Sequence, residues 1–196
     1  IFIPHINVGG VEKNLFLIAN YLAKKIDNIS IITVNKKFTK NLNKKIKIIS
    51  PKSRAWEDSS MYTKYIISIL LLINTLKSDR NYLVFSFQAN WYAIIISKLF
   101  GIKIVTRSNT APQGWSGSVI KKLIYKLVIN LADKIIVNSN EFKDSLKKYF
   151  NVNSACIYNP LNKSKILKLS KSIKKFDFFK SDKYLKIINI GRFTDQ

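Results

Sequence analysis

The feature that most constrains the fold is an alternation between short runs of β-branched residues and longer amphipathic stretches. The short runs predict strands and the longer stretches, with apolar positions at helical spacing, predict helices. The predicted strands cover residues 1–3, 29–34, 46–49, 82–87, 102–107, 134–138 and 155–158. The predicted helices cover residues 11–25, 62–77, 91–100, 119–131 and 141–150. This order is typical of an α/β fold with a Rossmann-like, doubly wound parallel sheet.

The composition indicates a folded and strongly basic domain. The chain has 196 residues, of which 47% are hydrophobic, enough for a packed core. Its formal net charge is +23, from 34 Lys and Arg against 11 Asp and Glu. Such a field attracts phosphates, anionic lipid or nucleic acid. The chain is also rich in Ile and Asn, so a genome-wide composition bias stays open as a source of the charge.

Several classes of site are excluded because the chain lacks the residues that their chemistry needs. The single Cys156 cannot form an internal disulfide and fits a reducing compartment, and the single His5 rules out a His-rich metal site. The stretch 114–117, Gly-Trp-Ser-Gly, does not match the G-x-S-x-G motif of hydrolases. The longest apolar run, 65–73, is far shorter than the about 20 residues that a membrane-spanning helix needs. We therefore expect no metal, no hydrolase triad and no membrane span.

A glycine pair, Gly9 and Gly10, lies between the first predicted strand and the first predicted helix. Backbone N–H groups at a helix N-terminus attract anions, and glycine lets a phosphate approach the backbone closely. The pattern is not G-x-G-x-x-G, no acidic residue follows the second strand, and no Walker lysine is present. These differences argue against a dinucleotide or a Walker site and leave a plain tight turn as the alternative.

Five motifs follow one another along the chain: GGVEKNLFLIANYLA at 9–23, RSNTAPQGW at 107–115, ADKIIVNSNEFKDSL at 132–146, IYNPLN at 157–162 and INIGRFTDQ at 188–196. In order and spacing they resemble the retaining, GT-B-fold glycosyltransferases of family 4. The resemblance is closest to bacterial enzymes that build cell-surface polysaccharides or glycans. Each motif alone is weak, but five in sequence are fairly specific.

The resemblance implies two facing Rossmann-like domains. The N-terminal, acceptor-side domain would cover residues 1–160, a linker 161–183, and the start of a truncated donor-binding domain 184–196. A new strand that meets the end of the chain is most simply explained by an N-terminal fragment. The Lys/Ser-rich linker leaves room for one short helix.

The donor side of the resemblance involves the glycine motif and one arginine. Gly9 and Gly10 match the glycine loop near the donor diphosphate, and Arg192 matches an arginine that neutralises the diphosphate leaving group. Glu12 matches the acidic residue of the glycine motif, although a first-turn Glu also stabilises a helix N-terminus. The nucleotide-diphosphate sugar is a substrate, and no cofactor or obligatory metal is expected. No catalytic residue is assigned, because the lysine and paired glutamates of the family fall at or beyond the end of the chain.

The acceptor side departs from the family pattern, because Arg107, Ser108 and Asn109 stand where many members carry a histidine. We expect Arg107 to bind an anionic acceptor or a donor phosphate, with a structural ion pair as the alternative. Asn109, Gln88 and Asn90 are further acceptor-binding candidates, the last two as partners of sugar hydroxyls. The hinge between the domains is expected at Asn159 and Pro160. Ser139 and Glu141 are interpreted as a helix cap and a first-turn acid.

The predicted helix at 119–131 is basic and amphipathic. Leu123, Leu127 and Leu131 fall on one stripe, with Lys121, Lys122 and Lys126 elsewhere. Such a helix lies on an anionic membrane surface or covers a sheet with its apolar stripe. A polyprenyl-diphosphate-linked acceptor would fit a basic domain that works at the inner face of the cytoplasmic membrane.

The sequence therefore predicts a cytoplasmic glycosyltransferase fragment with little or no activity alone, and peripheral association with the membrane is a hypothesis. One alternative is a basic Rossmann-like nucleic-acid-binding protein, which the charge favours. The aromatic residues 85, 87, 91 and 92 cluster as core residues do and not as a stacking platform between lysines, which argues against nucleic acid. The other alternative is a non-catalytic glycan-binding remnant.

Overall fold

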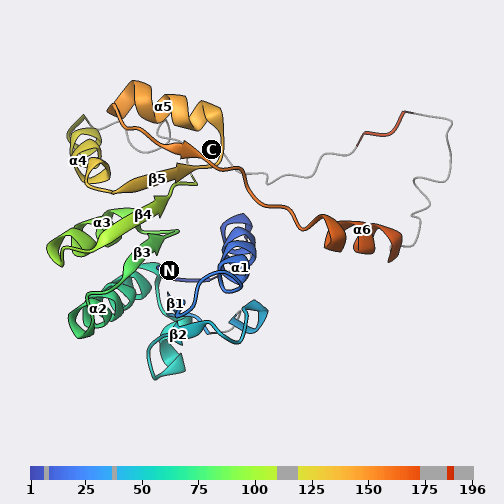
Figure 1. Cartoon of the computed structure of the whole chain (residues 1–196), viewed down its shortest axis with the longest axis horizontal. Helices are drawn as coiled ribbons and strands as arrows, with labels where there is room; N and C mark the ends of the chain where they lie inside the picture. The colour runs from blue at the N-terminus through green and yellow to red at the C-terminus, as the bar shows by residue number, and fades with distance from the viewer. Residues whose placement is uncertain (7–8, 37–38, 110–118, 173–184, 188–196) are drawn as a thin grey trace. The chain divides into compact units, whose positions relative to one another are not determined.

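The computed structural model (Figure 1) describes the chain except residues 7–8, 37–38, 110–118, 173–184 and 188–196. Contacts divide the chain into two units, Ile1–Pro160 and Leu161–Gln196. The described part of the second unit contains the helix α6 (Lys163–Ser172), where the sequence left room for a short helix. The strand expected at the start of a second domain falls largely outside the described residues.

The first unit is built on parallel strands. These are β1 (Ser30–Ile32), β2 (Lys47–Ile49), β3 (Leu83–Ser86), β4 (Lys103–Arg107), β5 (Lys134–Val137) and β6 (Ala155–Cys156). All the pairings between them are parallel, in the orders β1-β2 and β3-β4-β5-β6. The alternation with helices confirms the α/β class that the sequence predicts.

The first predicted strand joins these two sets of strands. Phe2 forms parallel bridges with both Ile32 of β1 and Ser86 of β3. Its N–H donates to the carbonyl of Phe85 at 2.8 Å, and the N–H of Ile3 donates to the carbonyl of Ile32 at 3.1 Å. The N-terminal segment is therefore the middle of a sheet that extends to β2 on one side and to β6 on the other.

Helices connect the strands. They are α1 (Gly10–Leu22), α2 (Met61–Ser78), α3 (Asn90–Leu99), α4 (Val119–Asn130) and α5 (Asn140–Phe150), with the short 3-10 turns η1 (Thr39–Asn41) and η2 (Arg54–Asp58). Gly101 follows α3 with φ +70, as expected for the residue that ends this helix. The Ser139 hydroxyl accepts from the N–H of Phe142 at 3.1 Å, so the predicted cap of α5 is present.

The two faces of the sheet have separate cores. Leu72 of α2, Ile94 of α3 and Val128 of α4 pack in one cluster with strand residues such as Ile104. A second cluster unites α1 with Ile3, Ile31 and Phe87, whose side chains leave the strands on the opposite face. A third joins α4 and α5 to β5. Figure 1 accordingly shows α2, α3 and α4 in succession along one side of the strands and α1 on the other.

Helix α4 covers the sheet with a different face from its leucine stripe. Val128 and Ile129 are buried, whereas Leu123, Leu127 and Leu131 are exposed. Helix α4 therefore covers the sheet, as one of the two predicted arrangements has it, but Val128 and Ile129 make the contact and the leucine stripe does not.

Candidate functional site at the carboxyl edge of the sheet

The connections on the two sides of the central segment leave the sheet in opposite directions. The segment at residues 1–3 continues through α1 on one face to β1, while β3 continues through α3 on the other face to β4. Open parallel sheets bind ligands at such a switch point, outside the carboxyl ends of the strands. His5 and Gly9 follow the first of these strands, and Gln88 and Asn90 follow the second.

Arg107 lies at the carboxyl end of β4 and is only 1% exposed. Its Nη2 donates to the carbonyl of Ile157 at 3.2 Å and to Oδ1 of Asn159 at 2.9 Å. Its Nε is buried without a hydrogen-bond partner among the described residues. Burial lowers the pKa of Arg107, although the nearby Cys156 raises it. A guanidinium that is bound by neutral groups alone keeps its positive charge available to an anion.

The alternative of a structural ion pair at Arg107 finds no support in the described part of the chain. The ion pair present there joins Nζ of Lys98 to Oδ2 of Asp133 at 2.6 Å, at the amino end of the strands. An unpaired buried charge is costly, so sites that retain one generally bind a counter-ion.

Asn159 links the end of β6 to two other elements. Its Oδ1 accepts from Arg107 and, at 2.8 Å, from Nδ2 of Asn14 on α1. Asn14 is buried, and sequence patterns did not indicate its role. The one sequence feature that could have indicated Asn14 is its position as a polar residue one helical turn after Gly10. Asn159 was predicted as a hinge residue, and with Pro160 it ends the first unit.

The three other predicted acceptor-binding residues differ in their hydrogen bonds. Both polar atoms of the Asn90 side chain are hydrogen-bonded within the fold. Its Oδ1 accepts from Ser86 at 2.7 Å, and its Nδ2 donates to the carbonyl of Arg107 at 3.1 Å. Asn109 donates to the carbonyl of Phe87 at 3.2 Å. Gln88 instead has a buried Oε1 without a partner among the described residues. Of the three, Gln88 has the acceptor most available to a ligand.

Gly9 and Gly10 begin α1 with ordinary backbone geometry. Gly9 is the N-cap, with an extended φ of -164 that any residue adopts. A Cβ built on Gly9 would lie 2.6 Å from Oε2 of Glu12, whose side chain folds back towards the helix N-terminus. A Cβ built on Gly10 would meet nothing within 4 Å. The fold itself therefore gives no reason for glycine at position 10, and open space adjoins the backbone there.

His5 is buried next to the glycine pair, and its Nδ1 has no partner among the described residues. Burial lowers the pKa of His5; Glu12 raises it and Lys64 lowers it. The ring nitrogen Nδ1 thus stays unused by the described fold. The sequence alone did not indicate His5 as a site residue.

The carboxyl edge thus brings together several buried polar atoms that the described fold leaves unpaired. They are Nδ1 of His5, Oδ1 of Asn35, Oε1 of Gln88 and Nε of Arg107. Buried polar atoms are rarely left unpaired unless a ligand or water satisfies them. Arg192, the remaining predicted diphosphate-binding residue, lies outside the described residues.

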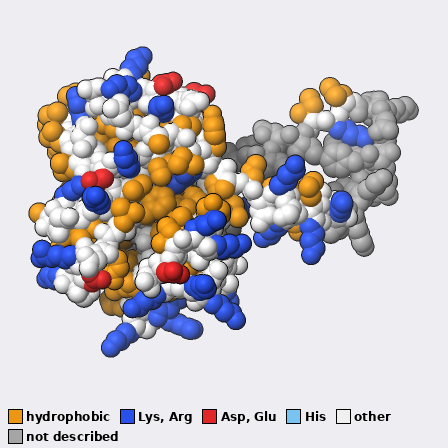
Figure 2. Space-filling model, in the orientation of Figure 1, with side chains coloured by type: hydrophobic (Ala, Val, Ile, Leu, Met, Phe, Trp, Pro, Cys, Tyr) orange, Lys and Arg blue, Asp and Glu red, His pale blue; other side chains and the backbone are white. Residues whose placement is uncertain are grey.

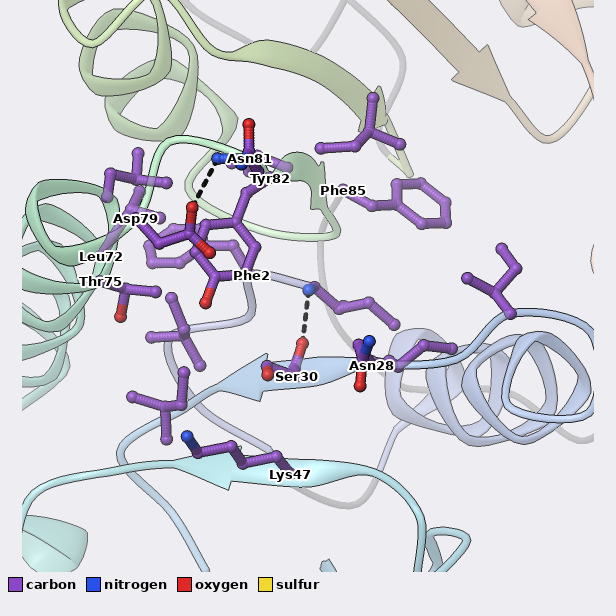
Figure 3. Close-up of a pocket in the computed structure, with 18 of the residues that line it drawn as sticks. Phe2, Asn28, Ser30, Lys47, Leu72, Thr75, Asp79, Asn81, Tyr82 and Phe85 are labelled. Carbon is purple, nitrogen blue, oxygen red and sulfur yellow. Dashed lines mark hydrogen bonds between the residues drawn. The ribbon is translucent and has the colours of Figure 1, made fainter.

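The pocket in Figure 3 lies at the opposite edge of the sheet. Its volume is about 730 Å³, and it is lined by Ser30, Lys47 and Leu83, which begin β1, β2 and β3. Asp79 and Asn81 also line it, and Oδ1 of Asp79 accepts from the N–H of Asn81 at 2.8 Å. None of the predicted site residues lines this pocket.

The surface of the first unit is predominantly basic. Figure 2 shows hydrophobic side chains near the centre of the viewed face, with many lysine and arginine side chains and few acidic ones around them. No group of three or more His, Cys, Asp or Glu side chains in the described ranges could hold a metal ion. Within the same ranges, no helix is long and apolar enough to cross a membrane.

This fold is that of the N-terminal half of a GT-B glycosyltransferase. The chain belongs to Glycosyltransferase Family 4, whose model matches residues 8–165. A search of the curated proteins finds no match.

Two solved structures are similar to the chain. The crystal structure of HepE from Anabaena, in complex with UDP, is 15% identical with a TM-score of 0.52, over 85% of this chain and 47% of that one. A UGT transferase from Siraitia grosvenorii, in complex with UDP, is 10% identical with a TM-score of 0.49, over 88% of this chain and 54% of that one. The HepE likeness concerns the fold, and no argument rests on the second structure. The chain spans about half the length of either structure.

Proposed function

We propose that the protein transfers a sugar, with retention of configuration, from a nucleotide-diphosphate sugar to a glycan or lipid-linked acceptor in the synthesis of cell-surface polysaccharide. The family match over residues 8–165 carries this proposal. In the reaction, the bond between the anomeric carbon and the diphosphate oxygen breaks. A bond from that carbon to the acceptor hydroxyl oxygen forms on the same face of the sugar. The hydroxyl proton leaves with the nucleoside diphosphate.

On the donor side, we assign the diphosphate to the backbone at Gly9 and Gly10 and to Arg192. The open space at Gly10 supports this assignment, because a helix N-terminus presents free N–H groups to an anion there. These groups, rather than an obligatory metal, would neutralise the leaving diphosphate.

On the acceptor side, we assign an anionic group to Arg107, whose buried Nε faces no partner in the described fold. A polyprenyl-diphosphate-linked sugar supplies such a group. The buried Oε1 of Gln88 would accept from a sugar hydroxyl, with Asn109 nearby on the loop after β4 and Asn90 holding the strand ends. The reaction would take place in the cytoplasm, at the inner face of the membrane that holds the lipid.

The proposal is tested in a full-length version that includes a donor-binding domain, by the release of nucleoside diphosphate from a panel of nucleotide sugars in the presence of a polyprenyl-diphosphate-linked sugar. Arg107→Gln removes the buried charge, and Arg80→Gln removes the same charge from an exposed loop residue. We expect kcat/KM for the acceptor to fall about tenfold to a hundredfold in the first variant only, since hydrogen bonds to charged groups are worth roughly 1.5–3 kcal/mol.

Thermal unfolding separates this effect from misfolding, and Arg107→Lys, which keeps the charge without the planar fork, should give an intermediate rate. Equal rates for the Arg107→Gln and Arg80→Gln variants would refute the role of Arg107. Binding of sugars without any turnover in the full-length version would favour the glycan-binding remnant over an enzyme.

A further inference from the structure

The helices that cover one face of the sheet turn large hydrophobic side chains outwards. On α4, Leu123 and Leu127 are 57% and 62% exposed, while Val128 and Ile129 pack inward. A sheet-covering helix normally exposes charged and polar residues on this side. The packing of the sheet therefore does not explain the exposed leucines of α4.

Helices α2 and α3 continue the same surface. Both expose aliphatic residues at helical spacing, and α3 contacts α2 on one side and α4 on the other. Figure 1 shows the three helices side by side, so their outward faces adjoin. The apolar outer face is defined here by two residues of each helix: Ile66, Leu70, Ile95, Leu99, Leu123 and Leu127. An adjoining apolar surface of this kind marks an interaction site in a soluble domain.

The charges on these three helices have one sign. Neither Asp nor Glu occurs in α2, α3 or α4, and the ionisable side chains other than tyrosine are lysines. They are Lys64, Lys77, Lys98, Lys121, Lys122 and Lys126. Lys98 is paired with Asp133, which lies just beyond the end of α4, and the three lysines of α4 are exposed.

Helix α5 provides an internal comparison. It packs beside α4 in the third core cluster, and its outward side carries both signs of charge, including Glu141, Lys143, Asp144 and Lys147. Its large exposed hydrophobic residue is Tyr149. A composition bias along the whole chain does not explain why α5 has an ordinary polar surface and α4 does not.

The chemistry of this face selects one occupant. A second copy of the chain in a two-fold arrangement would bring lysines against lysines. Nucleic acid would require aromatic platforms or basic grooves in place of exposed leucines. An anionic bilayer satisfies both features, because aliphatic side chains enter the acyl boundary while lysines extend to lipid phosphates.

We propose that the apolar outer face of α2, α3 and α4 binds the surface of an anionic lipid bilayer. No site residue at the carboxyl edge belongs to this set of six, so the interaction is independent of the proposed sugar transfer.

The test is flotation of the whole chain with vesicles, without any nucleotide sugar. Vesicles of phosphatidylcholine containing phosphatidylglycerol should carry the protein up the gradient, and vesicles of phosphatidylcholine alone should carry much less. Leu123→Ser with Leu127→Ser should lower partitioning about tenfold or more, because each buried methylene contributes to membrane affinity. Ile26→Ser is the matched control, since Ile26 is 54% exposed beyond the end of α1.

The charge is tested separately with two triple variants of equal charge loss. Lys121→Gln, Lys122→Gln and Lys126→Gln should weaken binding to the anionic vesicles strongly. Lys143→Gln, Lys147→Gln and Lys148→Gln on α5 should weaken it little. Equal effects of the two triple variants, or unchanged flotation of the leucine variant, would overturn the proposal. Analytical ultracentrifugation of the leucine variant tests a protein interface instead. A changed oligomeric state together with unchanged flotation would also overturn the proposal.

Discussion

At the scale of single residues, Arg107 is the clearest departure from what a fold needs. It is almost fully buried, its guanidinium is bound by a carbonyl and an amide oxygen, and its Nε is unused in the described fold. A core optimised for stability would pair such a guanidinium with an acid, or would carry an apolar residue in place of the arginine. The retained positive charge therefore indicates a function at the carboxyl edge.

A substitution next to Arg107 separates stability from function. Asn159→Asp would place a carboxylate where Oδ1 now lies 2.9 Å from Nη2 of Arg107. We expect the free energy of unfolding in urea to rise by about 1 kcal/mol, because a charge-assisted bond replaces a neutral acceptor. We also expect acceptor affinity to fall, since the new carboxylate neutralises Arg107. Unchanged kinetics in a stabilised variant would show that the charge of Arg107 does not bind the acceptor.

We expect the same substitution, glycine to alanine, to have opposite effects on stability at two positions. Gly10→Ala should leave the protein as stable or raise its free energy of unfolding by up to about 1 kcal/mol, because the new methyl meets open space in a helix. Gly101→Ala should cost about 1–2 kcal/mol, because φ is +70 there.

Donor kinetics reverse this order. In a full-length version that includes a donor-binding domain, Gly10→Ala, and more strongly Gly10→Val, should raise KM for the nucleotide sugar, whereas Gly101→Ala should leave it unchanged. Thermal unfolding and nucleotide-release assays measure the two effects. A normal KM in Gly10→Val would remove the glycine pair from the donor site.

At the scale of elements, the sequence predicted what local patterns determine. Strands and helices were recognisable from periodicity, and the ends of α3 and α5 from Gly101 and Ser139. The face of α4 that packs was not predictable, because this helix has two apolar stripes and only the rest of the fold chooses between them. The outer residues of α2 and α3 were missed for the same reason.

The candidate site was predicted in pieces. Arg107, Gln88 and Asn159 were each indicated by loops at strand ends, but their contacts were not. The bonds from Asn159 to Arg107 and to Asn14 span 52 and 145 positions along the chain. Periodicity carries no information about such pairs, and this is why Asn14 and His5 were missed.

The bonds of Asp133, which connect α3, β4 and β5, predict that the stability of the fold depends on pH. Oδ2 of Asp133 accepts from Lys98 at 2.6 Å and from the N–H of Ile104 at 2.7 Å, and these bonds, Lys98 first, lower the pKa of Asp133. A lowered folded-state pKa gives stability that is present above the unfolded pKa and is lost as the pH falls through the folded value.

Asp133→Asn should therefore cost about 1 kcal/mol in urea unfolding near neutral pH, since the pair is partly exposed. The difference from the natural chain should shrink as the pH falls below the ordinary aspartate pKa of about 3.9. A difference that stays constant across this range would show that the carboxylate charge contributes nothing.

At the scale of the whole molecule, the chain spans 47% of HepE, the solved GT-B structure with the same fold. We predict that these 196 residues alone release no nucleoside diphosphate from nucleotide sugars above the rate in buffer. Isothermal titration and the release assay measure binding and turnover on the same sample. Robust turnover would place a complete donor site within this chain and would contradict the prediction.

The central position of the N-terminal segment also has a consequence for folding. Phe2 and Ile3 are synthesised before β1, β2 and β3, yet Phe2 pairs with β3 as well as with β1. During synthesis, the set formed by this segment, β1 and β2 would have an unpaired inner edge until β3 emerges from the ribosome. Closing that gap requires a contact of long sequence separation, which slows folding. The segment at Phe2 is thus made before β1, yet it has both of its neighbours only once β3 is available.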